Sequence, residues 1–343
     1  MQKFFVNLKI DLCVRGSEMK KEKKSIGEIL WDLWCVVSVV GIWPRFIEPN
    51  LLSTTRLSID IEKLPVGLQK LKILHFTDLH LNGGMYNFFL EKLKKRAISL
   101  DPDLIVFTGD FLCNAKLGDK ERLADFFRNF PRARFGNYAV VGNHDYEKYA
   151  FINENGEYDA SSGKNLDSTI FRGLSKLFSK TVIKKRFTEA VSKVGLNQEL
   201  VEILKDSPFK LLHNETITVD INGSKLNISG LGEYMLNKAD VKTTFKNYDR
   251  NFPGIVLVHN PDAVISLLEH PGELILSGHT HGGQVNLPFL RNKFILMENP
   301  LFKRGLVRIK NKWIYTNRGV GGTMNFRWFS VPEMLLAELN NGK

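Results

Sequence analysis

Five short apolar stretches of this chain each end in residues that can bind a metal ion. Between the first three lie two stretches with the pattern of amphipathic helices, at 85–98 and 119–130. Short apolar runs that alternate with helices predict a parallel β-sheet of the α/β class. Because such sheets build sites at the carboxyl ends of their strands, the five ends are expected to meet at one edge. The predicted strands are Leu71–Phe76, Asp103–Thr108, Asn137–Val141, Gly254–Val258 and Glu273–Leu276.

The residues at these ends are carboxylates, imidazoles and one amide, with no cysteine thiolate among them. This donor set suits borderline-hard divalent ions such as Mn²⁺, Zn²⁺ or Fe²⁺. The candidates are too many for one closed tetrahedral site and are about right for two ions that share a bridging carboxylate. A further histidine, His144, remains as a proton donor to a leaving group. The candidate ligands are Asp78, His80, Asp110, Asn143, His259, His279 and His281.

Five segments resemble, in order, the motif blocks of the calcineurin-like metallophosphoesterases. They are DLH (78–80), GD (109–110), GNHD (142–145), HN (259–260) and GHTH (278–281). The resemblance covers the chain from about residue 55 to its end. It implies a four-layer αββα sandwich and two divalent metal ions, with Mn²⁺ expected and Fe²⁺ or Zn²⁺ as alternatives.

The resemblance also implies a role for each candidate residue. Asp110 would bridge the two ions, and His144 would assist catalysis. The two histidines of GHTH would serve different ions, and Gly278, Gly282 and Gly283 would let the backbone around them turn tightly. The implied ligands are Asp78, His80 and His281 for the first ion, and Asn143, His259 and His279 for the second.

Other motifs indicate a branch of that family. Its serine/threonine protein phosphatases carry an acidic residue and an arginine after the second block, where this chain has Cys113 and Asn114. The segments FIEPNLL (46–52), GHTHGGQ (278–284) and TNRGVGG (316–322) are similar to the membrane-associated bacterial branch. That branch contains a UDP-2,3-diacylglucosamine pyrophosphatase of lipid A biosynthesis, which implies hydrolysis to UMP and 2,3-diacylglucosamine 1-phosphate. The alternative is a general or cyclic-nucleotide metallophosphodiesterase.

The N-terminal region combines basic residues with an apolar run. Arg15 and four lysines precede Ile29–Trp43, a run of 15 residues that Pro44 follows. Spanning a bilayer takes about 20 apolar residues, and tryptophans and lysines favour the membrane interface. We therefore expect residues 1–50 to form a basic segment with a helix that lies in the membrane surface.

This interpretation also sets the expected location of the remaining domain, 51–343. A nucleotide-linked substrate implies the cytoplasmic face of the bacterial inner membrane, with peripheral or monotopic attachment. A helix that spans the bilayer would place the domain outside and weaken that substrate hypothesis. A hydrophobic helix packed on the domain is the other alternative.

A long interval separates His144 from His259. Its end is predicted to be a strand and then a hairpin that turns at Asn222-Gly223. Its beginning, 147–205, is interpreted as an inserted helical cap. Apolar residues at helical spacing within 170–178 would receive acyl chains, and basic residues would meet the diphosphate. An ordinary amphipathic helix packed on the core is the alternative.

The net charge of +11 indicates an anionic partner. The chain has no aromatic and basic strand motif typical of nucleic-acid binders, so the expected partners are a lipid-linked nucleotide and a membrane surface. A binding module with a structural metal site is a third hypothesis, which the surplus of ligands disfavours. The sequence leaves open the oligomeric state, and whether Asp145 orients His144 or Arg318 contacts phosphate.

Overall fold

The computed structural model describes residues 26–115, 117–162, 182–287 and 296–342. The chain divides into two compact units, Met1–Gly41 and Ile42–Lys343. The second unit begins earlier than the boundary expected after residue 50, and it contains every strand that the structure describes.

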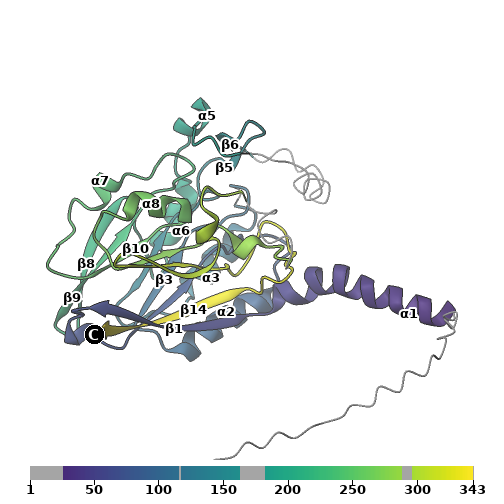
Figure 1. The fold of residues 1–343 in the computed structure, drawn as a ribbon, viewed down its shortest axis with the longest axis horizontal. Helices are drawn as coiled ribbons and strands as arrows, with labels where there is room; N and C mark the ends of the chain where they lie inside the picture. The colour runs from purple at the N-terminus through teal and green to yellow at the C-terminus, as the bar shows by residue number, and fades with distance from the viewer. Residues whose placement is uncertain (1–25, 116, 163–181, 288–295, 343) are drawn as a thin grey trace, which may run out of the picture. The chain divides into compact units, whose positions relative to one another are not determined.

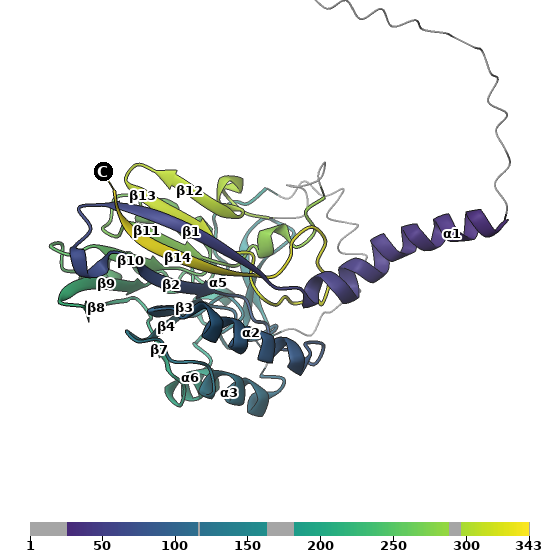
Figure 2. The ribbon, with the colours of Figure 1, turned by 90° about the horizontal axis from the view of Figure 1, so that it is seen from below.

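Two six-stranded sheets form the centre of the second unit (Figures 1 and 2). In spatial order, the strands of the first sheet are β1 (Ser53–Glu62), β14 (Glu333–Gly342), β2 (Leu71–Phe76), β3 (Leu104–Thr108), β4 (Asn137–Val140) and β7 (Phe209–Leu211). Those of the second are β12 (Gly305–Ile309), β13 (Lys312–Thr316), β11 (Leu274–Ser277), β10 (Gly254–Leu257), β9 (Ser224–Gly230) and β8 (Glu215–Ile221).

Helices cover the outer face of each sheet. The first sheet is covered by α2 (Asn87–Leu100), α3 (Lys120–Arg128) and α6 (Gln198–Lys205), which lie together in Figure 2. The second sheet is covered by α7 (Val241–Thr244), α8 (Val264–Leu267) and the short turns η4 (Pro261–Ala263) and η6 (Pro300–Phe302). A separate apolar core fills the space between the two sheets. The predicted four-layer αββα sandwich is therefore confirmed.

The five strands predicted to carry the site are all present, and each boundary agrees to about one residue. The predicted hairpin is β8–β9, in which Ile221 pairs with Ser224. Asn222 and Gly223 both have positive φ, as the favoured two-residue hairpin turn requires. The C-terminal strand β14 was not predicted. It lies parallel to β1 and antiparallel to β2, and so joins them.

The predicted cap, 147–205, is described in part. It begins with a hairpin of β5 (Tyr149–Ile152) and β6 (Tyr158–Ser161), and it continues through α5 (Glu189–Ser192) to α6. The apolar face of α6 joins the core beneath the first sheet, so this helix belongs to the outer layer. The stripe within 170–178 lies outside the described residues.

The N-terminal helix is longer than expected. It runs as α1 (Ile26–Val37), continues as a wider π-helical segment, η1 (Ser38–Ile47), and ends in the 3₁₀ turn η2 (Glu48–Asn50). The helix extends beyond the apolar run 29–43 and through Pro44, because the wider turn accommodates a residue that has no N–H to donate. By length and composition alone the run Leu30–Asn50, with a mean hydropathy of 1.4, could cross a membrane.

A buried histidine on β2 gives the fold a specific sensitivity to acid. The ring of His75 is fully buried, with Nε2 2.8 Å from Thr108 Oγ1. Burial lowers the pKa of His75 to about 3, against the weaker opposing effect of Glu333. Below pH 6.5 the unfolded chain therefore binds a proton that the folded chain excludes, and the free energy of unfolding falls as the pH decreases from 6.5 towards 3.

We expect His75→Asn to remove this part of the acid sensitivity. At pH 5 the histidine accounts for about 2 kcal/mol of lost unfolding free energy, relative to its effect at pH 7.5. Urea unfolding of wild type and variant at both pH values measures the difference. His270→Asn, on the loop before β11, is the matched control. An equal decrease in wild type and His75→Asn would contradict the prediction.

Candidate metal centre

The carboxyl ends of strands from both sheets meet at one place, and every predicted site residue lies there. Asp78 and His80 follow β2, and Asp110 follows β3. The neighbouring pair 143–144 follows β4. From the second sheet, His259 follows β10, while His279 and His281 follow β11. Each site residue lies two to four positions after the end of its strand, so the sheet backbone holds the site closely.

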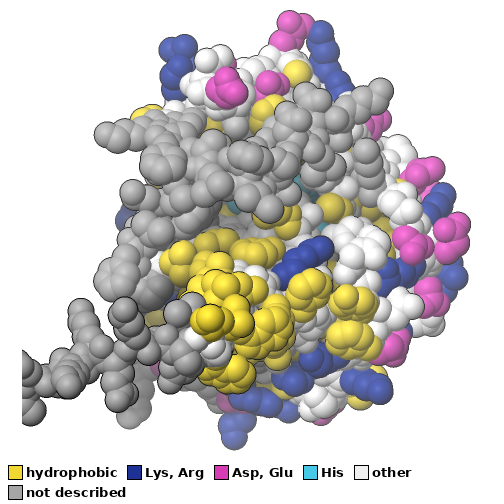
Figure 3. All heavy atoms as spheres, turned by 90° about the vertical axis from the view of Figure 1, so that its right-hand side faces the viewer, with side chains coloured by type: hydrophobic (Ala, Val, Ile, Leu, Met, Phe, Trp, Pro, Cys, Tyr) yellow, Lys and Arg dark blue, Asp and Glu magenta, His cyan; other side chains and the backbone are white. Residues whose placement is uncertain are grey.

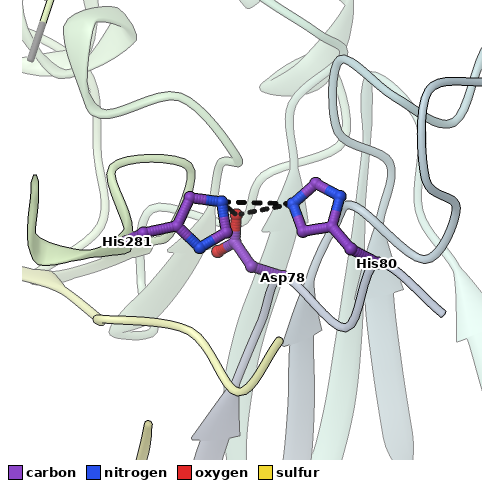
Figure 4. A group of neighbouring side chains, drawn as sticks. All are labelled: Asp78, His80 and His281. Carbon is purple, nitrogen blue, oxygen red and sulfur yellow. Dashed lines mark hydrogen bonds and ion pairs between the residues drawn. The ribbon is translucent and has the colours of Figure 1, made fainter. Parts of the chain in front are cut away.

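A first group brings together Asp78, His80 and His281 (Figure 4). The two Nε2 atoms of the histidines are 3.2 Å apart, and Asp78 Oδ1 lies 3.7 Å from His80 Nε2 and 3.6 Å from His281 Nε2. All three side chains are buried or nearly so. This is the set predicted for the first ion.

A second group contains Asp110, His259 and His279, with Asn143 beside them. Asn143 Oδ1 lies 3.1 Å from His259 Nε2 and 2.9 Å from His279 Nδ1. The Oδ2 atom of Asp110 lies 3.1 Å from His259 Nε2 and also 3.3 Å from His80 Nε2, in the first group. One carboxylate oxygen therefore faces both groups, as a bridging ligand must.

Hydrogen bonds at Nδ1 of two histidines determine which nitrogen of each ring faces the site with a lone pair. His80 Nδ1 donates to the carbonyl of Leu112, and His259 Nδ1 donates to the carbonyl of Thr108. In the neutral rings each Nε2 is then an acceptor, and it faces the Asp110 carboxylate. The two Nε2 lone pairs and the carboxylate oxygens repel one another unless positive charge lies among them. Protons or metal ions can supply that charge. The donor set therefore fits a pair of divalent cations.

The pKa values of the site residues also favour a bound cation. Burial alone would raise the pKa of Asp110, but the His259, His144 and His80 rings bring it well below the ordinary value. Burial lowers the pKa of His279 to about 4 and that of His281 to about 3. These two rings are neutral at neutral pH, so each has a lone pair available for a metal.

The backbone turns sharply where each strand delivers its ligands. Asp78, His80, Asp110, His279 and His281 all have positive φ, between 44° and 70°. Non-glycine residues adopt this left-handed conformation rarely, and they hold it where the surrounding structure imposes it. The strained turns place two side chains from one strand end, such as those of His279 and His281, in different groups.

Two glycines allow the loops to approach closely. A Cβ on Gly142 would lie 2.2 Å from Asp110 Oδ1, and one on Gly278 would lie 2.4 Å from Asp78 Oδ2. Any side chain at either position would displace a candidate ligand. Gly282 and Gly283 have positive φ, which confirms the predicted tight turn after the second histidine of GHTH.

His144 lies beside the two groups and has its own support. Its Nδ1 accepts a hydrogen bond from the backbone N–H of Asn114 at 3.0 Å, so a neutral ring carries its proton on Nε2. The ring stacks on Tyr149 with the planes 2° apart, and it lies 4.8 Å from the His80 ring, centre to centre. Burial lowers its pKa to about 3. The ring is thus fixed with an N–H donor directed away from Asn114.

Two residues left open by the sequence have structural roles. The carboxylate of Asp145 accepts the backbone N–H groups of Asp110, Leu112 and Gly142, at 2.7 to 3.0 Å. Through these backbone hydrogen bonds it ties together the loops after β3 and β4. Arg318 forms an ion pair with Glu333, with Nε 3.1 Å from Oε2. The Nε and Nη2 atoms of the guanidinium are thus bonded to that carboxylate, and the sequence had left open whether Arg318 contacts phosphate.

Sequence reasoning missed Arg327, which lies next to the first group. Its side chain is buried, and its Nη2 lies 3.4 Å from His281 Nδ1. The other bonds of its guanidinium are to backbone carbonyls, including those of Arg318 at 2.8 Å and Ser330 at 3.0 Å. No sequence pattern predicted it, because an arginine that binds carbonyls in a loop has no fixed spacing from the ligands.

Comparisons with known proteins agree with this geometry. The family described as "Calcineurin-like phosphoesterase" matches residues 71–283. The chain is 37% identical over 306 residues to the UDP-2,3-diacylglucosamine pyrophosphatase LpxG of Chlamydia muridarum, covering 86% of this chain and 91% of that protein. The Chlamydia trachomatis LpxG is equally similar, at 37% over 305 residues and the same coverage. YkuE of Bacillus subtilis, an uncharacterized metallophosphoesterase, is 27% identical over 303 residues, covering 87% and 89%. The chain therefore belongs to the calcineurin-like phosphoesterase family, and it is a metal-dependent phosphoester hydrolase.

Proposed function

We propose that this protein hydrolyses the pyrophosphate bond of UDP-2,3-diacylglucosamine, releasing UMP and 2,3-diacylglucosamine 1-phosphate for lipid A biosynthesis. The observation that carries the proposal is the 37% identity to two proteins named for that reaction, over 86% of this chain. The site supports the chemistry, because two groups of metal-competent side chains share Asp110. The net charge of +11 favours an anionic substrate and an anionic membrane surface.

The proposed metal ligands follow from the two groups. The first ion would be held by Asp78, His80 and His281, and the second by Asn143, His259 and His279, with Asp110 between them. We propose Mn²⁺ as the metal, with Fe²⁺ and Zn²⁺ as alternatives, because the set contains oxygen and imidazole donors and no thiolate. When bound, two such ions activate water as a nucleophile and stabilise charge at phosphorus.

The chain's own residues then orient the reaction. The amide of Asn143 donates to the carbonyl of Ala150 at 3.0 Å, which directs its oxygen towards the second group. The Nε2–H of the neutral His144 ring is the proposed hydrogen-bond donor to the oxygen that leaves phosphorus, where it would stabilise the developing negative charge. Asp145 keeps these two residues in register with Asp110 through the backbone of both loops.

The inserted cap expected at 147–205 stays a proposal for the part before α6, since α6 belongs to the outer layer. The first strand of that segment touches the site directly, because Ala150 bonds the backbone and the side chain of Asn143 while Tyr149 stacks on His144. A substrate bound at the metals would therefore meet this hairpin. Binding of acyl chains by the stripe within 170–178 remains part of the proposal.

We further propose monotopic attachment at the cytoplasmic face of the inner membrane. Residues from Ile42 onward belong to the catalytic unit, where Pro44, Glu48 and Pro49 are buried. The described part of the helix outside that unit, Ile26–Gly41, carries large exposed apolar side chains, among them Trp31 and Trp34, which suit the interface between lipid and water. Figure 3 shows hydrophobic side chains gathered in the face turned to the viewer, which suits contact with a membrane surface.

A product assay tests the proposed substrate. The purified full-length protein with Mn²⁺ would be given UDP-2,3-diacylglucosamine, an aryl phosphodiester and a cyclic nucleotide in parallel. We expect release of UMP to be strongly preferred, by its kcat/KM, over the other two reactions. Comparable turnover of all three would instead support a general or cyclic-nucleotide phosphodiesterase, and no turnover of the lipid would refute the proposed substrate.

A further inference from the structure

The segment FIEPNLL contains a buried carboxylate that the metal centre does not use. Glu48 is 2% exposed, although it lies at the end of the exposed apolar helix. Its carboxylate accepts hydrogen bonds from Trp43 Nε1 at 2.9 Å, from the backbone of Phe329 at 3.1 Å, and from the backbone of Ser330 at 2.5 Å. Glu48 therefore joins the end of the helix to a loop more than 270 residues away in sequence.

The loop that contains Phe329 and Ser330 is also hydrogen-bonded to His281, a proposed metal ligand. Ser330 Oγ donates to the backbone carbonyl of His281 at 2.6 Å. Ser330 is therefore hydrogen-bonded to the Glu48 carboxylate through its backbone N–H and to the backbone of His281 through its side chain.

Arg327 makes a second connection between the end of the N-terminal helix and the surroundings of His281. Its backbone N–H donates to the carbonyl of Pro44 at 2.8 Å, and its Nη1 holds the carbonyls of Arg318 and Ser330. Its Nη2 donates to the carbonyl of Gly321 and lies beside the His281 ring. The guanidinium is thus fixed by carbonyls from several turns of the chain.

We propose that Glu48 and Arg327 are positioning residues for the first metal ion: they fasten the loop 321–330 between the end of the N-terminal helix and His281. The inference rests on the proposed role of His281 as a ligand. His281 and the two glycines after it all have positive φ, so this turn depends on neighbouring structure to hold its shape. Groups that orient a ligand typically change metal affinity by roughly 10 to 100-fold when they are removed.

Binding of Mn²⁺ to the full-length protein tests the proposal. Calorimetry gives the affinity and number of ions, and electron paramagnetic resonance distinguishes a spin-coupled pair from a single ion. His281→Ala and His279→Ala provide the reference patterns for loss of the first and the second site. We expect Glu48→Ala and Arg327→Lys to weaken the first site by roughly 10 to 100-fold and to leave the second unchanged. Glu48→Gln, which retains one acceptor oxygen, is expected to lie between Glu48→Ala and wild type.

Glu273→Gln is the matched control. Glu273 also accepts a backbone N–H, that of Gly254 at 2.6 Å, but it lies at the opposite end of the strands from the site. A folded Arg327→Lys or Glu48 variant with wild-type affinity at both sites would overturn the proposal, as would equal weakening of both sites. Because Arg327→Lys retains the charge and most of the volume, it remains informative if Glu48→Ala does not fold.

The experiment also separates this inference from the proposed function. Mn²⁺ binding does not depend on which phosphoester is the substrate, so a wrong lipid assignment leaves the expected pattern unchanged. A wild-type protein that binds fewer than two ions would refute the proposed ligand set, and the positioning roles with it.

Discussion

Asp110→Asn is expected to abolish hydrolysis and to weaken both bound ions together. The Oδ2 atom of Asp110 is within 3.3 Å of the Nε2 atoms of His80 and His259, which belong to different groups. The amide keeps the shape of the carboxylate, and its oxygen can still accept the backbone N–H of His144, as Oδ1 does at 2.9 Å. The charge between the two groups is lost. Since metal charge supplies several kcal/mol to the transition state, the rate should fall by roughly 10³-fold or more.

Asp103→Asn provides a control on the same strand. Asp103 lies just before β3 and Asp110 just after it, and Asp103 Oδ2 accepts the backbone N–H of Lys72 at 2.9 Å. This variant should keep both ions and full activity. Turnover and Mn²⁺ stoichiometry of the two variants are the measurements. Retention of one ion at wild-type affinity in Asp110→Asn would show that this carboxylate does not bridge.

His144→Ala is expected to cause the second largest loss of activity. Unlike Asp110→Asn, it should leave metal binding intact. Both ions should remain bound, while kcat falls by roughly 10² to 10⁴-fold. The reason is geometric: Nδ1 of His144 already accepts from Asn114, so the ring presents an Nε2–H donor beside the two metal groups. Full metal occupancy combined with near-normal turnover would remove His144 from the mechanism.

Substrates with different leaving groups test the role of His144 more specifically. A hydrogen bond to the leaving oxygen matters most when that oxygen develops a large negative charge, and it matters little for an activated aryl oxide. The loss in His144→Ala should therefore be smaller with a nitrophenyl diester than with an alkyl or nucleotide diester. His213→Ala is the control, because His213 is a histidine bonded to Tyr146 rather than to any site residue. Equal losses with good and poor leaving groups would indicate a role in binding instead.

Much of the sheet and of the site follows from local sequence. The strands before Asp78, Asp110 and His259 are short apolar runs with polar ends, and a pattern of that kind depends only on neighbouring residues. The site residues meet because parallel strands share one carboxyl edge in each sheet and the two sheets face each other. The structure therefore gathers all the predicted residues in one place.

The features that escaped prediction depend on long-range partners. Strand β14 finds its place through pairing with β1 and β2, which no local pattern specifies. The buried roles of Glu48 and Arg327 depend on backbone groups far away in sequence. The helix continues past Pro44 because π-helical geometry overrides the usual effect of proline. Side-chain chemistry could be predicted from the sequence, whereas the packing that supports it could not.

The position of β14 has a consequence for how the protein is made. In the first sheet, β1 borders β14 alone among the described strands, and Ser53 pairs with Glu333, about 280 residues later. At 5–20 residues per second, a ribosome needs roughly 15 to 55 s to make the intervening chain. During that time β1 has no partner strand, while the apolar helix just before it has already been synthesised. The helix is therefore free to meet a lipid surface, its proposed partner, before β14 is available to complete the first sheet.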